Sequence, residues 1–254
     1  PLLLQMALYS AITGAERSFG PSTISVRGRI EFEGNAIEPI VLDNAFASDA
    51  AAAAIASSYT ASPLAYVMQA GFDQVVPSLV EISIEASERK KTFQVDQLWT
   101  TSREVRPGET LEIRASFAGE NGAELVRSVQ FAVPVGTTPG SLFVTLADAT
   151  TANITELTPL FSARPRTPAQ LSAAIRKLRP NNRLSIRVWR QESSFPVPGS
   201  EIANPPASVG LLLAKAQAGQ MSLPRGAKLA EFEIDLGDAV ATGSKTTSVE
   251  VKEP

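Results

Sequence analysis

The chain has 254 residues, of which 44% are hydrophobic and 19% are charged, and it contains neither histidine nor cysteine. The length is enough for one large domain or for a few small ones. Without histidine and cysteine, the chain by itself cannot perform His-based or Cys-based catalysis, build an ordinary zinc site or form disulfide bonds. A net charge of −3 argues against a dedicated nucleic-acid binder, because such domains are usually basic.

The first segment, 1–76, combines helical and strand patterns. Its apolar opening is too short for a membrane-spanning helix and is interrupted by Gln5 and Ser10. Alternating apolar residues then turn at Gly34-Asn35, which is typical of a β-hairpin. Alanine-rich sequence follows, and Ser62-Pro63 has the order of a helix start. The predicted elements are a helix over 2–17, a hairpin of 24–33 with 36–42, and helices over 43–58 and 62–70.

The central segment, 77–150, has the period of two expected of half-buried strands. Ile113, Ala115 and Phe117, for example, alternate with polar residues, and Pro-Gly turns separate successive runs. Several short alternating strands in sequence predict an immunoglobulin-like antiparallel β-sandwich. The predicted strands are 80–86, 111–117 and 125–133.

The last segment, 151–254, returns to mixed patterns after a proline-containing linker. Thr167 and Pro168 have the order of an N-cap and a first helical residue. We therefore expect a β-rich α+β fold, with the sandwich at 77–150 flanked by mixed segments at 1–76 and 151–254. The two flanking segments are candidates for a single domain. The predicted elements are helices over 168–178 and 208–216 and strands over 184–188, 229–236 and 239–251.

Several short motifs follow one another along the chain, and their order and spacing are informative. They are Val105 to Ile113 with its Arg-Pro-Gly-Glu turn, Val133-Pro134, Thr138 to Leu142, Leu178 to Leu184, Pro206 to Val209, and 14–42 with Val26-Arg27-Gly28 and Leu42-Asp43-Asn44. Together they resemble the region that follows the protease domain in secreted bacterial proteins with a SpoIVB-type peptidase. The resemblance covers most of the chain and implies a non-catalytic accessory region.

The resemblance also carries expectations about context. It implies an exported protein, in the periplasm, at the cell surface or outside the cell. The chain begins with Pro1 rather than Met, so we expect upstream sequence, and there the resemblance places a serine peptidase domain. The histidine and serine motif of that peptidase is not in this chain, so protease activity is not expected of it.

One stretch has a marked local charge. Between Glu156 and Glu192 the chain carries eight arginines and lysines and no acid, which gives a local charge of +8. Such a stretch can bind an anionic polymer or an acidic protein, with Trp189 contributing an aromatic surface. Alternatively, the cations lie on different sides of a helix and a strand and pair with carboxylates from elsewhere in the fold. The candidate ligand-binding residues are Arg176, Lys177, Arg179, Arg183, Arg187, Trp189 and Arg190.

Paired carboxylates offer the remaining route to catalysis. Glycoside hydrolysis needs two acids at roughly 5 to 10 Å. Glu231, Glu233 and Asp235 share one face of a predicted strand, as do Glu81 and Glu85, but a solvated sheet face explains both sets. Asp43, Asn44 and Asp49 are the nearest approach to an oxygen-ligand metal loop, and helix capping accounts for them. We predict no catalytic residue, metal site or cofactor.

These observations favour a non-catalytic accessory or interaction module that binds or positions an upstream peptidase. Its expected partners are the upstream domain of the same protein or another protein, with cell-wall polymer as a further candidate. Nucleic acid and a transmembrane segment are not expected. The alternatives are an anionic-polymer or carbohydrate-binding module and a His-free carboxylate glycosidase.

Overall fold

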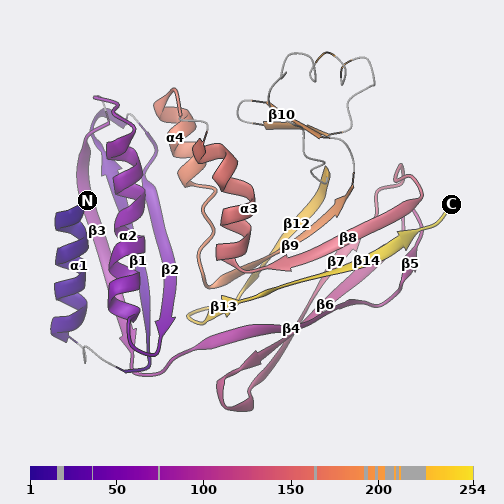
Figure 1. Cartoon of the computed structure of the whole chain (residues 1–254), viewed down its shortest axis with the longest axis horizontal. Helices are drawn as coiled ribbons and strands as arrows, with labels where there is room; N and C mark the ends of the chain where they lie inside the picture. The colour runs from indigo at the N-terminus through magenta and orange to yellow at the C-terminus, as the bar shows by residue number, and fades with distance from the viewer. Residues whose placement is uncertain are drawn as a thin grey trace.

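The computed structural model describes residues 1–15, 20–35, 37–73, 75–162, 165–191, 194–197, 200–203, 209, 212 and 227–253. Strands account for 48% and helices for 26% of the structure, so the expected β-rich mixture of strands and helices is confirmed. A helix-covered sheet lies at one end of the molecule and two larger facing sheets at the other (Figure 1). Helices α3 and α4 lie between them.

A three-stranded antiparallel sheet, in the order β2-β1-β3, forms the base of the N-terminal end. Its strands are β1 (Ser22–Phe32), β2 (Ile40–Ser48) and β3 (Pro77–Ser87). In β1, Ile24, Val26 and Ile30 are buried, whereas Arg27 and Arg29 face solvent. This alternation lets one face receive helices while the other stays in water. The expected hairpin forms, since β1 pairs with β2 and the short helix η1 (Glu33–Asn35) lies at the turn. Its second strand is Ile40–Ser48 rather than 36–42, so 43–48 lies in a strand and not in the predicted helix.

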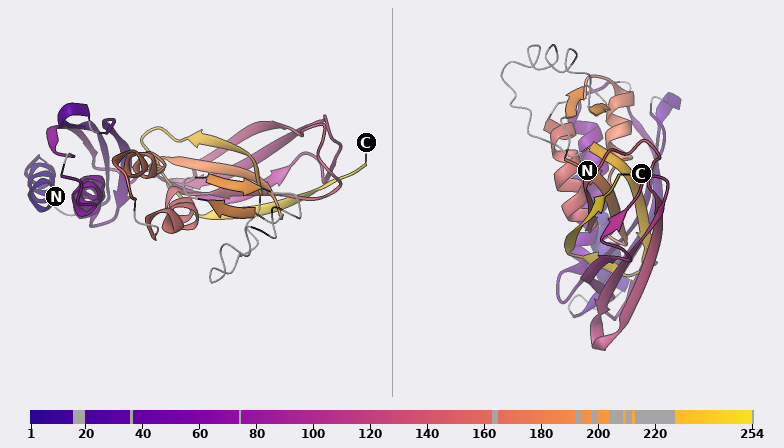
Figure 2. Two further views of the ribbon diagram at one scale, coloured as in Figure 1. Left: turned by 90° about the horizontal axis from the view of Figure 1, so that it is seen from above. Right: turned by 90° about the vertical axis from the view of Figure 1, so that its right-hand side faces the viewer.

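Helices α1 (Leu2–Ala15) and α2 (Ala52–Gln69) cover the buried face of this sheet. Leu8 and Ile12 are the buried residues of α1, and α1 packs beside α2 at the far end of the molecule (Figure 2). The prediction of two separate helices over 43–58 and 62–70 is wrong, because α2 runs through Pro63 without a break. The Ser62 hydroxyl donates to the Tyr59 carbonyl at 2.8 Å. That carbonyl would otherwise lack its helical partner, because proline has no N–H.

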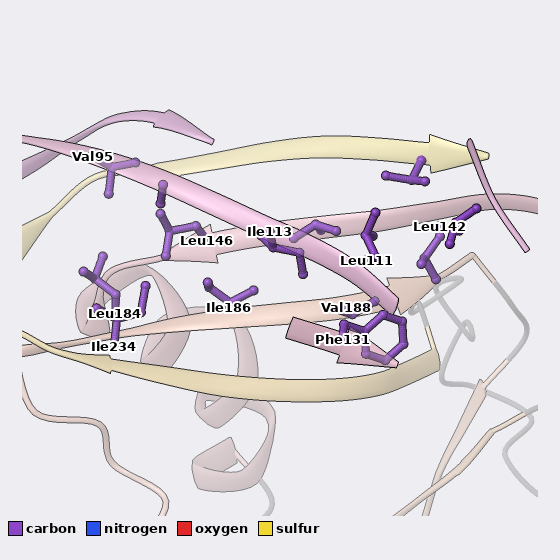
Figure 3. Packing of buried hydrophobic residues seen from close by; sticks show 14 of the residues in the cluster. Val95, Leu111, Ile113, Phe131, Leu142, Leu146, Leu184, Ile186, Val188 and Ile234 are labelled. Carbon is purple, nitrogen blue, oxygen red and sulfur yellow. The ribbon is translucent and has the colours of Figure 1, made fainter. Parts of the chain in front are cut away.

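The remaining large element is a sandwich of two facing sheets, in the orders β13-β4-β6-β7 and β12-β9-β8-β14-β5. Side chains from both sheets fill the space between them, including Ile113, Leu142 and Ile186, which are at most 1% exposed (Figure 3). Burying each such side chain is worth about 1.5–3 kcal/mol. The strands are β4 (Thr92–Thr100), β5 (Glu104–Val105), β6 (Thr110–Gly119), β7 (Glu124–Ala132), β8 (Gly140–Ala147), β9 (Arg183–Arg190), β12 (Ala227–Asp235), β13 (Val240–Thr242) and β14 (Ser244–Val251).

The strand pairings correct the expected limits of the sandwich at 77–150. Strand β3 pairs with β1 in the N-terminal sheet, while β9, β12, β13 and β14 from the last segment complete the sandwich. Alternation shows that a strand has one covered face, but it does not show which strand lies beside it. Gly28 of β1 makes the β3 pairing feasible: a Cβ there would lie 2.1 Å from the Glu81 carbonyl oxygen.

Helices α3 (Ala149–Ser162) and α4 (Pro168–Ile175) connect β8 to β9. The predicted cap of α4 is confirmed, because the Thr167 hydroxyl accepts from the Gln170 N–H at 3.3 Å. Leu171 and Ile175 of α4 pack into the apolar cluster under α2, so α4 belongs with the N-terminal sheet. The small remaining elements are η2 (Glu120–Gly122), β10 (Ser194–Val197) and β11 (Ser200–Ala203). The helix predicted over 208–216 lies outside the described residues, apart from 209 and 212.

Candidate functional site

The seven candidate residues for an anionic ligand, here called the cationic segment, run from the end of α4 along β9. Arg176 and Lys177 follow α4, and Arg179 lies in the connection to the strand. Arg183, Arg187 and Trp189 occupy alternate positions on β9, whereas Arg190 takes the opposite parity and is buried. The segment therefore spans several environments.

Arg179 forms the most enclosed ion pair of the segment, with Glu231 on β12. The side chains of the pair are only 13% and 21% exposed, and Lys228 also contacts the Glu231 carboxylate, at 2.6 Å. Burial raises the pKa of Glu231, but hydrogen bonds from Lys228 and Arg179 outweigh it and hold the pKa below its usual range. Glu231 is thus ionised at neutral pH and holds Arg179 in place.

Arg183 joins the sandwich to the N-terminal sheet. Its guanidinium lies 3.3 Å from the Asp43 carboxylate of β2 and 3.5 Å from Glu233 of β12. Beside it, the Asn181 N–H donates to Asn44 Oδ1 at 2.7 Å, and Asn181 Nδ2 donates to the Ala45 carbonyl at 3.3 Å. These contacts make a polar junction between two parts of the fold, so Arg183 is engaged in structure.

Arg190 and Trp189 are engaged at the far end of β9. Arg190 donates to the backbone carbonyls of Thr138 and Pro139 at 2.5 and 3.1 Å. Trp189 stacks on Phe143 with ring centres 4.7 Å apart, and its indole N–H donates to the Thr145 hydroxyl at 3.0 Å. Arg190 therefore anchors the turn before β8, and the Trp189 ring covers the outer surface of that strand.

Arg176 and Lys177 are the most exposed members of the segment. Arg176 pairs with Glu38 at the solvent surface, and Lys177 is exposed beside it. Arg187 lies across from Glu231 on one side and Thr145 on the other. The charges of the segment thus meet carboxylates and carbonyls from β2, β12 and the turn before β8, and the cations do not form one continuous surface.

The candidate carboxylates are likewise paired. Glu231 and Glu233 contact Arg179 and Arg183, and on the N-terminal sheet Glu81 and Glu85 contact Arg29 and Arg27 at 3.2 and 3.6 Å. A glycosidase needs one carboxyl that remains protonated, and the lowered pKa of Glu231 opposes that role. Within the described part of the chain, no group of three or more acids is placed to hold a metal ion.

A Ser-x-x-Lys spacing, which is not among the candidates above, runs from Ser87 at the end of β3 to Lys90. A catalytic dyad requires a neutral lysine that can accept the serine proton. Lys90 instead bonds Asp49 at 2.9 Å, and this hydrogen bond raises the pKa of its ammonium group. Lys90 is therefore protonated at neutral pH and is unsuited to act as a base.

A different surface, on α1 and α2, stands out by its lack of charge. Residues 1–15 and 50–72 contain no Asp, Glu, Lys or Arg. At the charge content of the whole chain, 38 such residues would carry about seven. Nevertheless, large apolar side chains on both helices are exposed. The uncharged helical face comprises Leu2, Leu3, Met6 and Tyr9 of α1, beside Ala54 of α2.

An open groove of about 400 Å³ crosses this face between the two helices. Met6 and Tyr9 line it from α1, and Ala54 lines it from α2. Leu3, next to the lining residue Leu2 in the chain, is 83% exposed. The remaining lining residues are Leu2, Gln5, Ser10 and Ser57. No sequence-based candidate included this face, although the two charge-free stretches that form it are visible in the sequence.

None of the described helices is long and apolar enough to cross a membrane. Comparison of the chain with protein-family models, with curated proteins and with solved structures found no match.

Proposed function

We propose that this chain is a non-catalytic interaction module that contacts another protein chain through the uncharged helical face. The observation that carries the proposal is that four large apolar side chains of α1 stand exposed next to α2, and neither helix carries a charge. Contiguous exposed apolar surface of this kind is uncommon on monomeric proteins and marks interaction sites. The outer face of the same sheet, with its Arg27 and Arg29 ion pairs, is by contrast an ordinary solvated surface.

The wider setting of the module is also a proposal. The motif resemblance supports an exported bacterial protein in which a SpoIVB-type serine peptidase domain lies upstream, with this module binding or positioning it. Two facing sheets with largely antiparallel pairing support an immunoglobulin-like sandwich as the rigid scaffold. A sandwich holds surfaces on its loops and attached elements in fixed positions, which suits a positioning role.

A binder of anionic polymer or carbohydrate is the second candidate. The stacked Phe143 and Trp189 pair and the exposed Lys177 favour it, but the buried pairing of Arg179 leaves less of the cationic segment for a ligand. Retention on heparin that falls with added salt would support this candidate, because screening weakens exposed charge contacts. The carboxylate glycosidase has less support, since Glu231 lacks the raised pKa of a general acid.

The proposed function is tested with the apolar dye 8-anilinonaphthalene-1-sulfonate on the whole chain at low protein concentration. We expect the folded wild-type chain to bind the dye, and Leu2→Glu with Met6→Glu to lose most of that binding while the thermal midpoint stays within about 2 °C, because both side chains line the groove and are exposed. Val41→Glu is the matched control, since Val41 is 76% exposed on the opposite face of the sheet.

Equal dye binding by all three proteins would contradict the assignment of the face. Peptide hydrolysis by the isolated chain that disappears on replacing one internal serine would contradict the non-catalytic assignment.

A further inference from the structure

We infer that the partner of the uncharged helical face is a second copy of this chain, related by a two-fold axis through α1 and α2. This inference rests on the proposed function, because it names the occupant of the same face. Three properties of the face point to a second copy: its charge, its shape and its area.

The charge pattern fits self-association better than binding to a charged partner. In a two-fold contact the same patch supplies both sides, so any charge near the axis faces its own copy. Like charges in such a contact are strongly unfavourable. The helices α1 and α2 carry no charge at all, so the face can meet itself without repulsion. An anionic membrane or nucleic acid would find no Lys or Arg on either helix.

A projecting side chain and a groove on neighbouring parts of one face allow self-complementary packing. Leu3 projects from α1 with 83% of its surface exposed. Met6, one turn further along α1, lines the largely apolar groove together with Tyr9 and Ala54. A two-fold axis between Leu3 and the groove would place Leu3 of each copy in the groove of the other, as a knob in a hole. Small exposed residues on both helices, such as Ala7 and Ala54, allow the close approach that helix packing needs.

The area of the face sets the strength of the contact. Helices of 14 and 18 residues are about 21 and 27 Å long and about 10 Å wide, so together they present about 500 Å². Two copies would bury about 1,000 Å², at the lower limit for a specific interface. We therefore expect a weak, reversible dimer rather than a permanent one.

The test is sedimentation equilibrium of the full chain between about 1 and about 500 µM, a range that covers weak, reversible association. Wild type should shift from monomer to twice the mass, and Leu3→Ala should weaken the dimer about 10-fold. Met6→Glu and Met6→Lys should each be monomeric throughout, and an equimolar mixture of the two should recover the dimer, because opposite charges then meet across the axis. Val41→Glu should dimerise like wild type.

A wild-type chain that stays monomeric to the highest concentration would overturn the second-copy inference. A mixture of Met6→Glu and Met6→Lys that stays monomeric, or wild-type mass unaffected by either substitution, would overturn it as well. Dye binding is measured separately on the dilute chain. If the chain stays monomeric but still binds dye through this face, the second-copy inference is wrong and the proposed function stands. Loss of face-dependent dye binding defeats the proposed function.

Discussion

In both the cationic segment and the uncharged helical face, the residue types alone give a poor indication of which side chains are exposed, but for different reasons. The cationic segment has a local charge of +8, yet Arg179, Arg183 and Arg190 contact acids or carbonyls of other elements. The helices α1 and α2 carry no charge, yet Leu3 and Met6 stand in solvent. Charge can be matched by a distant partner within the fold, whereas an apolar side chain left in water has lost burial that folding ordinarily provides.

The contrast implies that a residue of the cationic segment contributes more to the free energy of unfolding the more deeply it is buried. Its strongest test is Arg179→Ala, which should lower the free energy of unfolding by about 4 kcal/mol, because Glu231 would be left half-buried with one partner fewer. Lys177→Ala, an exposed neighbour, should change it by less than about 0.5 kcal/mol. Urea unfolding of the two variants measures the difference. Equal losses would mean that Arg179 is a surface cation like Lys177.

Within the N-terminal end, the helical face should tolerate substitution while the sheet beneath should not. Gly28→Ala should cost about 3 kcal/mol, since the added methyl would overlap the Glu81 carbonyl of β3 and push the strands apart. Gly136→Ala, where no atom lies within 4 Å, serves as the control. Thermal unfolding measures the stability of both variants. A neutral Gly28→Ala would show that β3 is not held against β1 as closely as the structure has it.

The polar junction beside Arg183 is the next smaller effect. Asn44 Oδ1 accepts from the N–H groups of Ala45 and Asn181, so Asn44→Ala should leave both without this acceptor and cost about 1–2 kcal/mol. Asn44→Asp keeps an oxygen in that position and should cost less. If both variants lose equal stability in urea unfolding, the junction does not depend on this acceptor.

The smallest effect is a pH dependence carried by Glu231. Hydrogen bonds from Lys228 and Arg179 outweigh the effect of burial and hold its folded-state pKa below the ordinary value of a glutamate side chain. A carboxyl with a lowered pKa adds stability that is complete above its unfolded-state pKa and is lost as pH falls through the folded-state pKa. Glu231→Gln should therefore flatten the fall in stability below about pH 4.5. An unchanged acid limb of the stability curve would assign that fall to other groups.

Local patterns predicted local structure well in this chain. The turn at Gly34 requires a positive φ of 61°, which glycine adopts readily, and the β1 hairpin forms there. Thr167 and Pro168 start α4 as expected. Pro63 led to a wrong prediction of a new helix start, because the Ser62 hydroxyl supplies a hydrogen bond that lets α2 continue through the proline. Local signals fail where a neighbouring side chain compensates for them.

The site was predicted less well than the elements. The acid-free stretch from Glu156 to Glu192 identified cations, but their partners on β2 and β12 are far away in sequence. Conversely, the apolar spacing predicted a helix over 2–17 without showing which of its side chains are covered, and in α1 only Leu8 and Ile12 are buried. Helical spacing indicates that a helix has an apolar stripe, but it does not show how much of that stripe other elements cover.

The sequence by itself excluded histidine and cysteine chemistry and indicated the β-rich class and many strand and helix positions, because these follow from residue types and short-range spacing. Strands β4 and β8 and helix α3 were not among the predicted elements. Only the tertiary structure shows that β3 pairs with β1 in the N-terminal sheet rather than joining the sandwich, and that strands from the last segment complete the sandwich. It also decided which charges are paired and which apolar side chains remain exposed. These outcomes depend on contacts between residues far apart in the chain, and no local pattern records which partner a face will meet.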